Sequence, residues 1–123
     1  MTRKIIIDCD PGIDDAVAIA MALFDPRLEV LAITAAAGTI EASQATTNVT
    51  GIVGQLDPPR YPRIGKATAA DNPPVVDDNV LHGNDGLGGC NFEPSGRQHQ
   101  TPSEKVISEL VHQNPNSITL VCL

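Results

Sequence analysis

The apolar residues of the chain fall into short runs that predict four β-strands. Residues 5–7 are three consecutive isoleucines, and residues 28–35 form a longer, mostly apolar run. Short apolar runs bounded by polar residues are typical of strands buried inside a sheet. Residues 62–66 could hold a short third strand, and residues 117–123 form another apolar run that predicts the fourth.

Three other segments repeat apolar residues at the three- and four-residue spacing of a helix. The first begins at Asp14, the second covers residues 42–56, and the third begins at Thr101, where Thr101 could cap, Pro102 fits the first helical position and Glu104 could complete a capping box. The residues predicted to face the core are Val17, Ala20, Met21 and Phe24 in the first helix, Val49, Ile52, Val53 and Leu56 in the second, and Val106, Ile107, Leu110 and Val111 in the third.

The alternation of strands and helices predicts an α/β fold. Right-handed crossovers would build an open, mostly parallel sheet with helices on both faces, and the predicted order ends on the fourth strand. We expect residues 1–123 to form part of a single domain. Residues 67–100 are rich in Gly, Pro, Asn and Asp, and a connection of this length in a compact domain is often functional.

Charge and composition narrow the classes of function. Fifteen acidic and eight basic residues give a net charge of −7 without any basic cluster, so nucleic acid is not an expected partner. No run approaches the ~20 apolar residues of a membrane helix, so a membrane is not expected either. The cysteines, Cys9, Cys90 and Cys122, form no C-x-x-C pair, and the N-terminus lacks a signal peptide's apolar stretch. Both features favour a reducing, cytoplasmic location.

Four acids, Asp8, Asp10, Asp14 and Asp15, lie within eight residues immediately after the first strand. In open α/β sheets, ligands bind beyond the carboxyl ends of the strands, so these side chains are expected at the binding edge. Four carboxylates would repel one another unless a cation lay among them, and Ca²⁺ accepts a shell of carboxylates and carbonyls. The alternative interpretation is structural: Asp10 would cap the following helix, and Asp14 and Asp15 would favour its first turn.

The segment 8–16, with the sequence DCDPGIDDA, resembles the N-terminal signature of the inosine–uridine-preferring nucleoside hydrolase family. Residues 32–38, Thr47-Asn48 and the segment 82–89 (HGNDGLGG) are also similar to that family. The resemblance extends over the whole chain but over less than half of a usual member. It implies a calcium-dependent enzyme of purine or pyrimidine salvage, which hydrolyses the N-glycosidic bond of a ribonucleoside to give ribose and a free base.

The resemblance also implies roles for individual residues. Asp10 and Asp15 would bind Ca²⁺ through their side chains, and Leu123 would bind it through its backbone carbonyl. Asp14 would be the general base that accepts a proton from the attacking water, and it would also contact the substrate. Asp8 would support the metal ligands from behind.

Two further residues are expected to contact the substrate. Thr39 stands where the family usually has an asparagine that touches the ribose, and His82 lies in the loop that borders the family's active site. The family's leaving-group histidine and its last calcium-binding aspartate would lie beyond position 123. We therefore expect hydrolysis by this chain to be impaired or absent. Base preference and the oligomeric state are left open, with a homo-oligomer among the expected assemblies.

Two other functions compete with this interpretation. A haloacid-dehalogenase-like phosphatase would use Asp8 as nucleophile and Asp10 as acid with Mg²⁺. However, that family usually has Thr or Val where this chain has Gly12, and it does not account for Asp14 and Asp15. The other alternative is a domain that binds a nucleoside or a partner chain without catalysis, because the last strand would leave an open edge.

Overall fold

The computed structural model describes residues 2–38, 40–69, 87 and 101–123, and these form one parallel sheet with helices on both sides. All three strand pairs are parallel, and the strand order is β3-β2-β1-β4. The sequence-based prediction of an open α/β fold is therefore confirmed. Along the chain the elements are β1 (Arg3–Cys9), α1 (Ile13–Leu23), β2 (Leu28–Ala35), α2 (Ala42–Leu56), β3 (Arg63–Gly65), α4 (Ser103–Gln113) and β4 (Ile118–Cys122).

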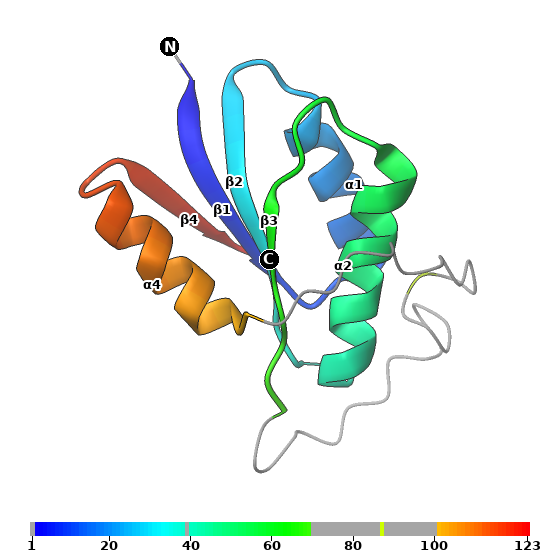
Figure 1. Cartoon of the computed structure of the whole chain (residues 1–123). Coiled ribbons are helices and arrows are strands. Elements are labelled where there is room, and N and C mark those ends of the chain that lie inside the picture. Colours follow the sequence, from blue (N-terminus) through cyan, green and yellow to red (C-terminus); the bar gives the residue numbers. More distant parts are fainter. Residues whose placement is uncertain (1, 39, 70–86, 88–100) are drawn as a thin grey trace.

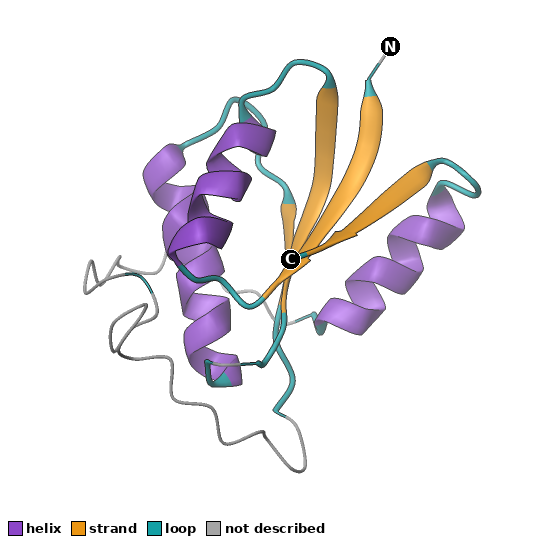
Figure 2. Cartoon of the chain, turned by 180° about the vertical axis from the view of Figure 1, so that it is seen from behind, coloured by secondary structure: helices purple, strands orange, loops and turns teal. Residues whose placement is uncertain are grey.

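Helices α1 and α2 cover one face of the sheet, and α4 covers the other (Figures 1 and 2). The side chains of β1 alternate between the two layers, as the two-residue period of a strand requires. Ile5 and Ile7 join the core cluster with Ile19 of α1, whereas Ile6 packs with Val106 of α4 on the other side. Because both faces are covered, consecutive isoleucines can all be buried, as expected for a parallel sheet.

The predicted inner face of α1 is wrong. Val17, Met21 and Phe24 are more than half exposed, whereas Asp15 and Ile19 are the buried residues of the helix. Since α1 is apolar around most of its circumference, periodicity alone does not determine which side of the helix faces the sheet. The turn before the helix determines it, because the backbone N–H of Gly12 donates to Asp15 Oδ2 and so fixes the side that carries Asp15.

The other helices follow the prediction more closely. In α2, Val49, Ile52 and Val53 are buried, and the helix ends at Asp57, whose φ of 43° is left-handed. In α4, Val106 and Leu110 are buried and Ile107 is partly buried, but Val111 is exposed.

The predicted cap of α4 is also wrong. Pro102 is the N-cap, and no side chain caps the helix. Instead of capping the helix, Thr101 accepts the N–H of Lys66 at its carbonyl, at 2.9 Å. This bond belongs to a parallel bridge between Lys66 and Pro102, just beyond the end of β3. In the described part of the chain, no helix has the length and apolar character needed to cross a membrane.

The strand order places a topological switch point at the carboxyl end of β1. The chain passes from β1 to β2 and β3 in one direction, and α4 then returns it to β4 on the other side of β1. The connection after β1 therefore runs toward β2, whereas the connection through α4 runs to β4 on the opposite side of β1. In open α/β sheets this switch point is where ligands bind, and it is where the acidic segment begins.

Candidate active site

Asp8, the first acid of the segment, is held by both strands that flank β1. The hydroxyl of Thr34 on β2 donates to Asp8 Oδ1 at 2.6 Å, and the backbone N–H of Leu123, just after β4, donates to the Asp8 carbonyl at 2.9 Å. Thr34 is fully buried and Asp8 is half-buried. These bonds fix the carboxyl end of β1 against its neighbours before the chain enters the acidic turn.

Asp10 lies against the loop that follows β2. A Cβ added at Gly38 would lie 2.4 Å from Asp10 Oδ2, so only glycine leaves room for the carboxylate in this position. The same loop is tied to β1, because the N–H of Ala36 donates to the Cys9 carbonyl at 2.8 Å. The end of β2 therefore limits where the Asp10 carboxylate can go.

The two acids at the start of α1 have different environments. Asp15 is buried, and its Oδ2 accepts the backbone N–H of Gly12 at 3.4 Å. Asp14 is exposed. Gly12, rather than Asp10, is the N-cap of α1, so the interpretation of Asp10 as a helix cap is wrong. The Asp15 carboxylate points back into the turn, and Asp14 remains accessible to a ligand beside it.

Helix α2 also reaches the acidic turn. Asn48, which is 3% exposed, donates from Nδ2 to the carbonyl of Pro11 at 3.5 Å. Its Oδ1 in turn accepts a hydrogen bond from Gln44 Nε2 at 2.8 Å. Gln44 and Asn48 both belong to α2, so this helix contributes polar support to the turn as well as apolar packing.

The acids produce a strong negative field at the end of β1. The pKa of the Cys9 thiol is raised to about 12, first by burial and then by the charges of Asp15, Asp8 and Asp10, in that order. All three carboxylates thus act on the same buried thiol, although they are spread over eight residues of sequence. The same negative field would favour a cation at this place.

The donor chemistry fits a hard cation, but the described residues provide only part of a metal shell. Carboxylate and carbonyl oxygens are the ligands of Ca²⁺, which takes six to eight of them. Among residues 2–38, 40–69, 87 and 101–123, no three His, Cys, Asp or Glu side chains come together as a metal-binding group. A calcium shell that included Asp10 and Asp15 would therefore need further oxygens from outside this set.

Some predicted site residues lie outside the described part of the chain. Thr39 and His82 are among them, as is most of the segment 67–100. Leu87 is described within that segment: it is buried and belongs to the core cluster on the side of α1 and α2. The supporting residues Thr34, Gln44 and Gly38 were not identified from the sequence. Among these three, only Thr34 could have been recognised from the sequence, because it is a polar residue inside an apolar strand.

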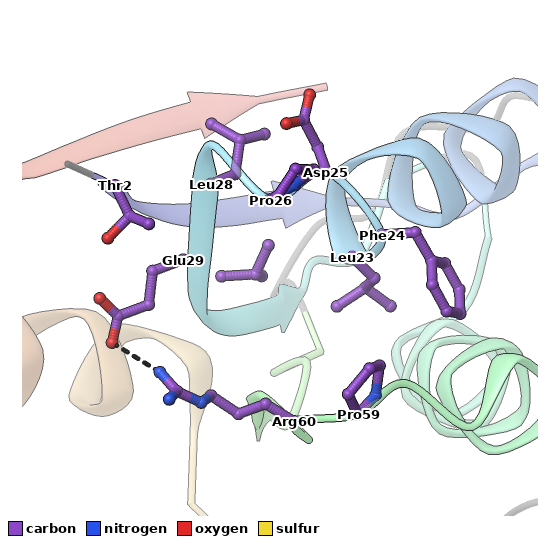
Figure 3. Close-up of a pocket in the computed structure, with 10 residues that line it drawn as sticks. Thr2, Leu23, Phe24, Asp25, Pro26, Leu28, Glu29, Pro59 and Arg60 are labelled. Carbon is purple, nitrogen blue, oxygen red and sulfur yellow. Dashed lines mark hydrogen bonds and ion pairs between the residues drawn. The ribbon is translucent and has the colours of Figure 1, made fainter.

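A separate cavity of about 480 Å³ lies at the other end of the sheet, where β2 begins. Figure 3 shows Leu23, Phe24 and Leu28 on its apolar side, with Arg60 and Glu29 joined by an ion pair at 3.2 Å. None of the four acids of the segment 8–15 lines this cavity. It is therefore not the site to which the acidic turn belongs.

The chain is similar to known nucleoside hydrolases in both sequence and fold. The pyrimidine-specific ribonucleoside hydrolase RihA of Klebsiella pneumoniae subsp. pneumoniae is 36% identical over 123 residues, which cover 98% of this chain and 39% of the relative. A solved plant nucleoside hydrolase, PpNRh1, is 32% identical with a TM-score of 0.86, and the match covers 100% of this chain and 40% of that one.

The purine-preferring ribonucleoside hydrolase from Gardnerella vaginalis has the same TM-score of 0.86, at 25% identity, over 98% of this chain and 40% of its own. The chain thus spans about 40% of the length of these relatives. A sequence model of the family described as inosine-uridine preferring nucleoside hydrolase matches residues 5–123. This match covers nearly the whole chain, which belongs to the inosine-uridine preferring nucleoside hydrolase family.

Proposed function

We propose that this chain forms the calcium- and ribose-binding part of an enzyme that hydrolyses the N-glycosidic bond of ribonucleosides. The observation that carries the proposal is the acidic turn at the switch point of the sheet, where Gly38 leaves room for the Asp10 carboxylate and the Gly12 N–H donates to the buried Asp15. Both a pyrimidine-specific and a purine-preferring relative resemble the chain, so the proposal extends to ribonucleosides in general rather than to one base.

Asp10 and Asp15 are the proposed side-chain ligands of Ca²⁺, together with the backbone carbonyl of Leu123. In a parallel pair, the N–H and C=O of one residue point toward the same neighbouring strand. The N–H of Leu123 donates to Asp8 on β1, so its carbonyl is directed toward the β1 side, where the chain continues to Asp10. This direction supports a carbonyl ligand beside the two carboxylates.

Bound calcium would supply an oriented, acidified water and would hold the ribose hydroxyls. Asp14 is the proposed general base, since it is exposed next to the buried Asp15 and can accept a proton from such a water. Glycosidic cleavage passes through an oxocarbenium-like transition state. The four carboxylates carry more negative charge than one Ca²⁺ neutralises, and the surplus favours the positive charge that develops on the ribose.

Asp8 has a supporting role in this proposal. Its Oδ1 already accepts the Thr34 hydroxyl, and its backbone carbonyl accepts the N–H of Leu123. These bonds suit a residue that fixes the strand ends better than a nucleophile, so they weigh against the phosphatase alternative. Thr39 and His82 remain proposed contacts to ribose and base.

Calcium titration of the 123-residue chain, by calorimetry or by displacement of Tb³⁺ luminescence, tests the proposal. We expect weak binding that is lost in Asp10→Ala and retained in Asp25→Asn, a control at the far end of α1. Binding that survives in Asp10→Ala would show that the metal site is elsewhere. In parallel, release of ribose from inosine and uridine is expected to be low, because the described residues supply only part of the metal shell.

A further inference from the structure

The acidic turn has a buried carbonyl that α2, rather than the turn itself, satisfies. Pro11 is almost fully buried, and as a proline it has no N–H that could help to pin the turn. Its carbonyl accepts Nδ2 of Asn48 at 3.5 Å. A buried carbonyl without a partner is costly, so this hydrogen bond favours one position of the turn even though it is long.

The amide of Asn48 is itself oriented by α2. Gln44 lies one helical turn earlier, and its Nε2 donates to Asn48 Oδ1 at 2.8 Å. With the oxygen engaged by Gln44, Nδ2 is the group presented to Pro11. The next residue, Val49, is also buried but belongs to the apolar cluster, so adjacent residues of α2 serve separate roles.

Pro11 lies between the two proposed calcium ligands. Asp10 precedes it directly, and Gly12, which follows it, donates its N–H to Asp15 Oδ2. A shift of the Pro11 peptide therefore moves the backbone of Asp10 and the donor that orients Asp15 together. Coordination distances tolerate only about 0.2 Å, so such a shift would affect metal binding before it unfolded the domain.

We propose that Asn48 is a positioning residue for the metal site: oriented by Gln44, its amide holds the Pro11 carbonyl and so sets the spacing of the Asp10 and Asp15 carboxylates. This inference rests on the proposed metal role of Asp10 and Asp15. It assigns to α2 a part in the active site that does not involve contact with substrate, and it makes calcium affinity depend on a hydrogen bond made outside the acidic segment.

The test compares Asn48→Leu with Val49→Ala in the 123-residue chain. Leucine has the same number of side-chain heavy atoms as asparagine and the same branching at Cγ but cannot donate to Pro11, whereas Val49→Ala weakens the core without touching the turn. We expect calcium affinity to fall about 10-fold or more in Asn48→Leu, as for other groups that support metal ligands, and to stay within about 2-fold in Val49→Ala. Equal affinities in Asn48→Leu and the wild type would overturn the inference.

Gln44→Met provides a second variant if Asn48→Leu does not fold. It removes the donor that orients Asn48 from a half-buried position, so a smaller loss of affinity is expected. An affinity equal to that of the wild type would count against the orienting role.

Carboxyl ¹³C shifts of Asp10 and Asp15, measured without metal, separate this inference from the proposed function. Shifts that move in Asn48→Leu but not in Val49→Ala support the positioning of the Asp10 and Asp15 carboxylates by Asn48, whether or not the wild type binds calcium. Failure of the wild type to bind calcium would refute only the proposed function. Shifts that do not move refute positioning.

Discussion

Replacing Gly38 by alanine tests how closely the loop after β2 confines Asp10. An added Cβ would lie 2.4 Å from Asp10 Oδ2, whereas ordinary contact begins at 3.4 Å, so the carboxylate or the loop must move by about 1 Å. The φ angle of Gly38 is not in the left-handed region, so the backbone itself accepts alanine. The substitution therefore acts through this one contact rather than through backbone strain.

A displacement of about 1 Å is several times the ~0.2 Å tolerance of a metal–ligand distance. We therefore expect the calcium affinity of Gly38→Ala to fall about 10- to 100-fold, the scale seen when groups that hold metal ligands are changed. The affinity would be measured by calorimetry on the 123-residue chain, with urea unfolding as a separate measure of stability. The free energy of unfolding should change by less than the free energy of calcium binding, because the Asp10 side chain is only half-buried and can rotate outward.

The matched control is Ala37→Ser, at the exposed neighbouring position of the same loop. It should bind calcium as the wild type does. The reasoning would be refuted if Gly38→Ala also bound calcium normally while Asp10→Ala did not, because Asp10 would then be a ligand whose position Gly38 does not limit.

Three further predictions concern single side chains. Thr34→Val removes the buried hydroxyl that donates to Asp8 and should lower the free energy of unfolding in urea by about 1.5 to 3 kcal/mol. Arg27→Gln should raise the pKa of Asp25, which Arg27 lowers to about 2 mainly through side-chain hydrogen bonds, as carboxyl NMR titration would show. Cys9 should resist alkylation by iodoacetamide at pH 8, because its thiol pKa is raised to about 12.

Each of these has its own control. Thr119→Val changes an exposed threonine on β4 and should leave the unfolding free energy nearly unchanged. For Asp25, the folded pKa is depressed, so its stabilising effect is complete above its ordinary value of 3.8 and is lost as the pH falls toward about 2. Stability that depended on Arg27 at pH 1 would contradict this. For Cys9, the exposed Cys122 should react readily in the same experiment, and equal labelling of both would contradict the burial argument.

Much of the architecture could be predicted from the pattern of apolar residues. The runs 5–7 and 28–35 are apolar enough to require cover on both faces, which is a property of parallel sheets, and the segments between them have helical spacing. The prediction of which face of α2 is buried was correct, because most of the other residues of the helix are polar and only one orientation buries the apolar ones. The face of α1 was wrong because its sequence is apolar nearly all round, so the pattern allowed several orientations.

The acidic turn could also be located, because four carboxylates after a buried strand are unusual and their place in the fold follows from strand direction. What supports the turn could not be predicted. Thr34, Gly38 and Asn48 lie 19 or more residues away from Asp15, and their hydrogen bonds and contacts depend on distances that no local pattern encodes.

The sequence by itself determined the α/β class, the positions of the strands and helices, and the family, because these depend on local periodicity and on one distinctive acidic segment. The tertiary structure alone decided which side of α1 is buried, that Asp8 is held from both flanking strands, and that α2 supports the turn between the proposed ligands. The physical reason is that hydrogen bonds and steric contacts act over a few ångströms, and only the strand order β3-β2-β1-β4 brings these distant residues within that range.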